Sequence, residues 1–371
     1  MTNQTPIVAA NFSPFRLVLR DQEADWNADL ELINDRSYDY VKLHRASTFI
    51  DVGIAPWSLV VGYDGTLAIP AKPELREPDV AIHIFNSFLC DLLLGGLYCE
   101  AVSPDELRIG TISSDSYMRM HSGAQGPIAQ FHESIKTKIA GPLDTIRLLE
   151  PPKVRVRELT ACFHKGSTRR SKLGSISPET IIYGTTFFTK NQRAESLLHL
   201  WTSTEQLIET IWKSEVLEQP IIDGASKKRR KDFLSDNRTW TASSKLEVLY
   251  QKRLIPDDTY LLLDRTRRSR NAFAHSGKKP SDEEVTAALT VFFELCSLLI
   301  SGFSETGELK EVEKMIKERK GKYLEWERTR EPIDGVSHWL PIPPIPGDEN
   351  WGDEPYEIIE ELQLKDMSGE A

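Results

Sequence analysis

The sequence predicts an α+β protein: a mixed N-terminal half, an all-helical second part and an acidic, proline-containing tail. Short β-branched runs separated by Gly, Pro and Asp recur up to residue 188, as strands and their turns do. From residue 191 to 303, apolar side chains recur every three or four positions, the period of an amphipathic helix. Residues 331–371 hold eleven acidic residues and one lysine, a composition typical of segments that bury no core.

The N-terminal half, residues 1–188, is expected to be one α+β domain that acts as a sensor or docks a partner. Two helices are predicted, at 78–98 and 127–140. The segment 177–188 is expected to be a last strand or a linker. Four alternating or β-branched runs are predicted as strands: 15–20, 38–44, 58–63 and 153–159.

Residues 191–303 are predicted to form a helical domain. In its first helix, one apolar stripe collects six side chains: Ala194, Leu197, Trp201, Ile208, Ile211 and Trp212. A later helix is expected to begin at Ser281, because Ser281 and Glu284 have the spacing of a capping box. Residues 304–330 are predicted as a charged helix, and 331–371 as the tail.

Composition narrows the class of protein. The tail carries the whole net charge of −10, so the acidic balance does not exclude a polyanionic partner for the rest of the chain. The four cysteines have no metal-ligand spacing and 164–174 lacks the order of a phosphate loop, so we expect no metal and no cofactor. The N-terminus has no signal-peptide pattern and the apolar run 80–98 contains Asp91. We therefore expect a cytoplasmic protein that does not enter a membrane.

One basic run stands out. The stretch RNAFAH covers residues 270–275. On a helix, Arg267 just before it, Asn271 and His275 are four residues apart and share one face, whereas Arg270 lies about 140° around the helix from His275. If both Arg270 and His275 serve one site, the helix must end or distort there. Gly277 and Pro280 supply such an ending.

Arg270, Asn271 and His275 resemble the signature of HEPN domains, which are helical ribonuclease modules. Upstream, Trp201 and Glu205 are similar to the leucine-tryptophan, three residues, glutamate pattern in the first long helix of the Apea-like branch. The resemblance covers about 191–303 and leaves the N-terminal half unrecognised.

The resemblance implies a metal-independent endoribonuclease in bacterial antiviral defence or a toxin-like growth arrest. His275 suits acid/base chemistry because imidazole titrates near working pH. Arg270 suits stabilisation of the phosphorane because guanidinium stays charged, and Asn271 would orient the imidazole or the phosphate. HEPN domains pair their motifs across a cleft, so a homodimer or a larger even-numbered assembly is implied. The products implied are a 2′,3′-cyclic phosphate and a 5′-hydroxyl.

RNA, including tRNA, would then bind cationic side chains beside the motif, largely without regard to sequence. Two groups are predicted: Arg265, Arg267 and Arg268, and Lys227, Lys228, Arg229, Arg230 and Lys231. Such charge runs also occur as solvated helix faces or loops, and 164–174 has the composition of a flexible basic loop.

Several alternatives stay open. The helical domain is either a nuclease or a non-catalytic dimerisation scaffold, and a toxin half modified on a tyrosine is disfavoured by Phe273. Glu205 either pairs with an arginine of the motif or turns to solvent at the edge of the stripe. The tail is either a solvated segment or an RNA mimic that covers the basic site and docks through four residues: Trp339, Leu340, Trp351 and Tyr356.

Overall fold

The computed structural model describes most of the chain up to residue 321, within a compact unit that spans Met1–Tyr323. The described ranges are 4–23, 25–28, 30–35, 38–121, 126–137, 151–218, 227–236, 238–303 and 309–321. The tail lies outside these ranges. So do two parts of the predicted charged helix, residues 304–308 and 322–330.

A six-stranded antiparallel sheet forms the centre of the N-terminal half, with the order β3-β4-β5-β1-β6-β7. The strand β1 (Gln4–Asn11) pairs with β5 on one side and β6 on the other. The other strands are β3 (Ala46–Ile50), β4 (Leu59–Gly62), β5 (Thr66–Pro70), β6 (Arg108–Ser113) and β7 (Met118–Met120). A separate parallel pair joins β2 (Leu17–Leu19) to β8 (Lys153–Arg155). The predicted α+β class is confirmed.

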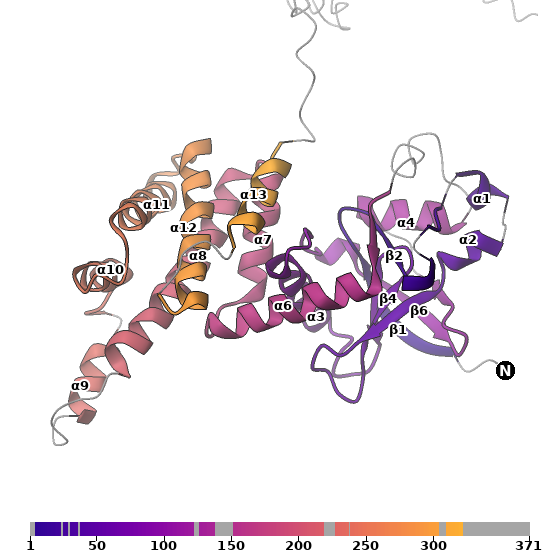
Figure 1. Ribbon diagram of the computed structural model, residues 1–371, viewed down its shortest axis with the longest axis horizontal. Coiled ribbons are helices and arrows are strands. Elements are labelled where there is room, and N and C mark those ends of the chain that lie inside the picture. The colour runs from indigo at the N-terminus through magenta and orange to yellow at the C-terminus, as the bar shows by residue number, and fades with distance from the viewer. Residues whose placement is uncertain are drawn as a thin grey trace, which may run out of the picture. The chain divides into compact units, whose positions relative to one another are not determined.

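Helices α3 (Pro78–Gly95) and α6 (Val156–Lys172) pack backbone to backbone (Figure 1). A Cβ added at Gly95 would lie 1.9 Å from the carbonyl oxygen of Cys162, and one at Gly166 would lie 1.6 Å from that of Asp91. Only glycine permits this crossing. Smaller elements complete this half: η1 (Asp21–Glu23), α1 (Leu30–Asn34), α2 (Tyr38–Lys42), η2 (Pro104–Glu106) and α4 (Pro127–Thr137).

The second part is helical, as predicted. Helix α8 (Arg193–Trp212) packs on α7 (Pro178–Thr189), α11 (Asp257–Ser276) and α12 (Asp282–Ser301). Its predicted stripe is buried from Leu197 to Trp212, and the Ser281–Glu284 capping box at the start of α12 forms with both hydrogen bonds. The remaining elements are η3 (Lys213–Leu217, a π-helical turn), α9 (Lys227–Leu234), α10 (Ala242–Gln251) and α13 (Lys310–Arg319).

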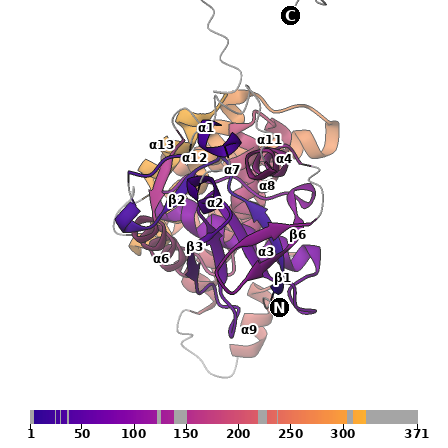
Figure 2. The ribbon, with the colours of Figure 1, turned by 90° about the vertical axis from the view of Figure 1, so that its right-hand side faces the viewer.

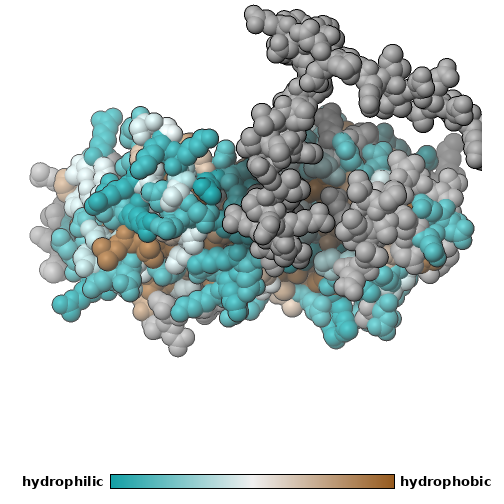
Figure 3. Space-filling model, turned by 90° about the horizontal axis from the view of Figure 1, so that it is seen from above, coloured by the Kyte–Doolittle hydropathy of each residue, from teal (hydrophilic) through white to brown (hydrophobic). Residues whose placement is uncertain are grey.

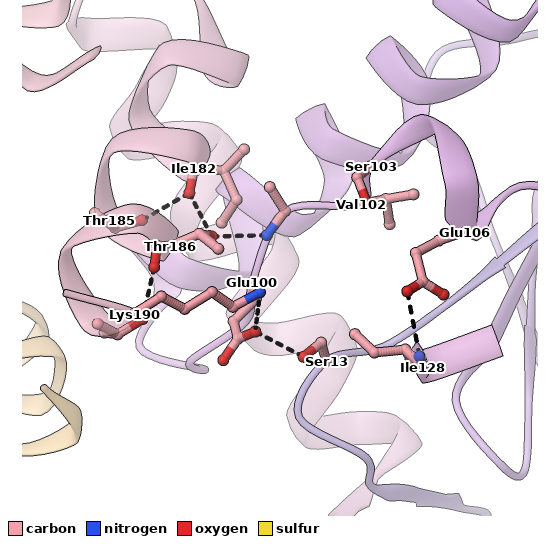
Figure 4. Close-up of polar contacts among 12 residues, drawn as sticks. Ser13, Glu100, Val102, Ser103, Glu106, Ile128, Ile182, Thr185, Thr186 and Lys190 are labelled. Carbon is pink, nitrogen blue, oxygen red and sulfur yellow. Dashed lines mark hydrogen bonds and ion pairs between the residues drawn. The ribbon is translucent and has the colours of Figure 1, made fainter. Parts of the chain in front are cut away.

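A buried carboxylate joins the sheet half to α7. Glu100 accepts a hydrogen bond from Ser13 Oγ at 2.8 Å and pairs with Lys190 Nζ at 3.2 Å, just after α7 ends (Figure 4). The backbone N–H of Ala101 donates to Thr186 Oγ1 on α7 at 2.8 Å. One hydrophobic core continues from β1 to α13. The expected boundary near residues 188–191 thus lies between two helices that pack on each other, α7 and α8.

Four local predictions were wrong. Residues 38–42 form helix α2 because Tyr40 and Leu43 reach the core at helical spacing. The predicted strand 153–159 ends at Arg155, whose backbone N–H is capped by Glu158 as α6 begins. The segment 177–188 is helix α7, with Pro178 in its first turn, where proline is favoured. The basic segment 164–174 lies mostly inside α6 and is no flexible loop.

Two helices, α3 and α12, are long and apolar enough to cross a membrane, but 72% and 67% of their apolar windows are buried within the fold. Burial of this kind is usual for core helices of a soluble protein.

Candidate functional site

Helix α11 carries the predicted motif close to its C-terminal end. The helix runs to Ser276 and is closed by Gly277, whose φ is 67° and whose N–H donates to the Phe273 carbonyl at 2.9 Å. The helix does end at Gly277, where glycine is suited to the left-handed conformation. This end comes after His275, however, so it does not bring Arg270 and His275 to one face of the helix as the single-site prediction required. Arg270 and His275 both lie within the helix, so their side chains leave it in directions about 140° apart.

Arg270 and Asn271 are in direct contact. Nη1 of Arg270 donates to Oδ1 of Asn271 at 3.1 Å, and both side chains are half-buried. Within the described ranges, Arg270 forms no ion pair with a carboxylate. His275 is exposed and has no hydrogen-bond partner among the same residues. The motif thus offers one guanidinium without a counter-charge and one solvent-accessible imidazole.

The neighbouring arginines are paired. Asp264 binds Arg267 through Oδ1 at 2.7 Å and Arg268 through Oδ2 at 2.6 Å, and these partners hold the pKa of Asp264 below its usual range. Arg265 pairs with Glu283 of α12 at 3.0 Å. The structure places all three predicted RNA-binding arginines of this group beside the motif, each in an ion pair, so that two carboxylates offset two of their three charges.

The charge around the motif is consequently balanced. Residues 257–284 contain six Lys and Arg side chains and six Asp and Glu side chains. Hydrophilic residues dominate the face seen in Figure 3 at the end where α11 lies in Figure 1. The sequence prediction named the arginines of this run but not the acidic residues that balance their charge. Asp264 at i−3 and i−4 from two arginines was the available signal.

The second basic group lies on a different helix. Helix α9 exposes Lys228, Arg230 and Lys231, and the side chains of Lys227 and Arg229 lie outside the described set. Its end is fixed by Trp212, whose Nε1 donates to the Leu234 carbonyl at 3.1 Å. Figures 1 and 2 both show α9 well apart from α11. The two predicted basic groups therefore do not form one patch.

Glu205 lies half-buried on α8. In the described part of the chain it forms no ion pair with an arginine of α11, so the first of the two alternatives, pairing with the motif, is not observed. One turn further along, Glu209 instead pairs with the buried Lys245 of α10. This ion pair ties α8 to α10.

A cluster of buried titratable groups with strongly shifted pKa values lies in the N-terminal half. The fully buried Asp64 carboxylate accepts hydrogen bonds from His132 Nδ1 and Lys136 Nζ of α4, both at 2.8 Å. Burial lowers the pKa of His132 to about 4, despite the opposing effect of Asp64. These partners close Asp64 off from solvent, so the cluster anchors α4 to the β4–β5 turn.

No group of three or more His, Cys, Asp or Glu residues in the described ranges has the geometry to hold a metal ion. No protein-family model matches the chain, and no curated protein or solved structure matches it either. The resemblance to HEPN domains therefore rests on sequence motifs alone.

Proposed function

We propose that the chain is a metal-independent endoribonuclease of the HEPN type, acting in the cytoplasm in antiviral defence or growth arrest. His275 acts as the acid/base and Arg270 stabilises the phosphorane, across the cleft of a homodimer or larger even-numbered assembly. The observation that carries the proposal is that one helix end presents both an exposed His275 and an Arg270 that meets no carboxylate among the described residues and is held by Asn271.

Arg270 supports this role because it keeps its positive charge available. A guanidinium held by a neutral amide is oriented but not neutralised, and an oriented, uncompensated charge stabilises the oxygens of a phosphorane best. Asn271 is then a positioning residue for Arg270, since its Oδ1 accepts from Nη1. Its amide N–H groups remain available for a phosphate oxygen.

His275 supports this role because solvent and substrate can reach it. An imidazole that takes the proton from a 2′-hydroxyl must approach it to hydrogen-bond distance. The exposed position of His275 on α11 permits this contact without rearrangement.

The competing function is a non-catalytic scaffold that uses the same helix end as an interface. An interface centre is depleted of charged residues, whereas His275 and the adjoining Lys278 and Lys279 are exposed and polar. The wild-type protein is tested by incubation with total RNA and tRNA in EDTA, followed by analysis of product ends. Cyclic phosphate and 5′-hydroxyl ends support the proposal. RNA that stays intact with a dimeric protein, both as the full chain and as a chain that ends at Arg330, contradicts it.

A further inference from the structure

A second polar site lies in the N-terminal half, far along the sequence from the motif. It is a pocket of about 290 Å³. Three cations line it. Arg20 follows β2, while Lys42 and Arg45 flank the turn between α2 and β3. None of the helices α7–α13 contributes a lining residue. We call this set of three cations and the space between them the Arg20 pocket.

Two of the cations are held in place by groups that leave their charge intact. Arg20 donates to the carbonyls of Ser47 and Ala46 at 3.3 and 3.2 Å, and its guanidinium lies 5.6 Å from the centre of the Tyr63 ring. Lys42 Nζ lies 4.8 Å from the centre of the Trp26 ring. Carbonyls and aromatic faces orient a cation without neutralising it. Side chains ordered in advance lose less conformational entropy when a ligand binds.

The carboxylates of the pocket do not satisfy the cations fully. Glu23 lies 3.6 Å from Lys42 Nζ, and Asp115 lies 3.7 Å from Arg45 Nη1, both beyond hydrogen-bond length. Glu23 is also committed to the Tyr63 hydroxyl, which donates to it at 2.5 Å. Among the lining residues that the structure describes, three cations therefore face two carboxylates that bind them only loosely. Arg45 Nη1 also donates to the Asp115 carbonyl at 3.1 Å, which orients this guanidinium without neutralising it.

The geometry points to a binding site for the phosphate group of a small phosphorylated molecule in the Arg20 pocket. A phosphate carries up to two negative charges and three acceptor oxygens, which matches three converging cations better than a single carboxylate does. The volume of about 290 Å³ is at the lower end of small-ligand pockets. It exceeds the space of a phosphate alone, so part of an attached sugar or nucleoside fits. An RNA backbone needs an open groove instead. This inference does not depend on ribonuclease activity.

The test is calorimetric titration of the full chain with inorganic phosphate, AMP and adenosine at constant ionic strength. We expect phosphate and AMP to bind and adenosine not to bind. Tighter binding of AMP than of phosphate would identify a phosphomonoester as the ligand, and equal binding would identify free phosphate; both results support the site. Lys42→Gln and Arg45→Gln should each weaken binding by about tenfold, the effect of losing one charge-assisted hydrogen bond.

Lys72→Gln is the matched control, because Lys72 Nζ lies 5.0 Å from the Trp57 ring centre in the same kind of contact, outside the pocket. It should bind as the wild type does. The inference is overturned if the wild type binds neither phosphate nor AMP, if adenosine binds as well as AMP, or if Lys42→Gln and Arg45→Gln bind as the control does. It is also overturned if only a 2′-O-methyl RNA binds and these two variants abolish that binding. The wild-type titration decides the question even if a variant folds poorly.

Discussion

Arg270 Nη1 donates a hydrogen bond of 3.1 Å to Asn271 Oδ1, so adjacent residues of one helix hold a guanidinium with a neutral partner. Nearby, Asp264 forms an ion pair with Arg267 through one carboxylate oxygen and with Arg268 through the other. Two kinds of arginine therefore share α11: three that form ion pairs with carboxylates, and Arg270, which forms none with the residues that the structure describes.

Replacing Arg270 with alanine should abolish cleavage while leaving the fold intact. Loss of one preorganised donor to a developing oxyanion typically lowers kcat by about 10²–10³. The lost contact with Asn271 is partly exposed, so we expect the free energy of unfolding to change by about 0.5 kcal/mol or less. RNA cleavage and urea unfolding measured on the same preparation check both expectations. A large loss of stability would indicate that Arg270 is structural.

Asp264→Asn should tighten RNA binding because it releases Arg267 and Arg268 from their counter-ion. Each cation freed for a single-stranded phosphate should steepen the slope of log K against log salt by about 0.7. The measurement uses a 2′-O-methyl RNA, which cannot be cleaved, in the background of His275→Ala. Asp258→Asn, near the start of the same helix, is the control. An identical slope in both variants would rule out a role for these arginines in binding.

Stability should fall as the solution is acidified from about pH 6.5 towards pH 4. Burial, chiefly, lowers the pKa of both His44 and His132 from 6.5 to about 4 in the folded protein. Since the unfolded chain takes up these protons first, the full stability is present above the unfolded pKa and is lost below it. His44→Phe retains an aromatic ring to stack on Tyr117 and should flatten the decline measured by thermal unfolding. The exposed His164→Phe should not.

Ser281→Ala should destabilise the protein by about 1 kcal/mol, because it removes the side-chain acceptor that caps α12. Ser281 Oγ accepts a hydrogen bond from the Glu284 N–H at 3.2 Å, and the Ser281 N–H donates to Glu284 Oε2 at 2.7 Å. Urea unfolding against Ser114→Ala, an exposed turn serine, measures the difference. Equal midpoints would show that the cap contributes nothing measurable.

The helices with strong local signals could be predicted from the sequence. Three such signals are the proline at the start of α3, the apolar stripe of α8 and the capping box of α12. Each lies within the helix that it predicts or at its start. Helices α2 and α7 could not be predicted, because short runs rich in Tyr, Ile, Thr and Phe fit both the 3.6-residue period of a helix and the two-residue period of a strand. Tertiary packing decides between the periods there. The strand β1 went unpredicted although it is central to the sheet, since its pairing with β5 and β6 is non-local.

The candidate site was predicted in part. The helix and its end at Gly277 follow from local sequence, and so does the sharing of one helix by Arg270 and His275. The pairing of Arg265 with Glu283 required the packing of α11 on α12. The Arg20 pocket is assembled from several stretches of sequence, which lie around residues 20–23, 42–46, 63 and 115–116. No local pattern encodes such a site.

The most direct test of the central proposal compares wild type, His275→Ala and Arg265→Ala on tRNA and total RNA in EDTA. Arg265 lies on the same helix but pairs with Glu283, so it is the matched control. Each protein is assayed with its full chain and with a chain that ends at Arg330, which relieves any inhibition by the tail. We predict cleavage by wild type and Arg265→Ala and none by His275→Ala, with all three assembled alike on a sizing column. Cleavage by His275→Ala at the wild-type rate, or none by wild type in either length, would contradict the proposal.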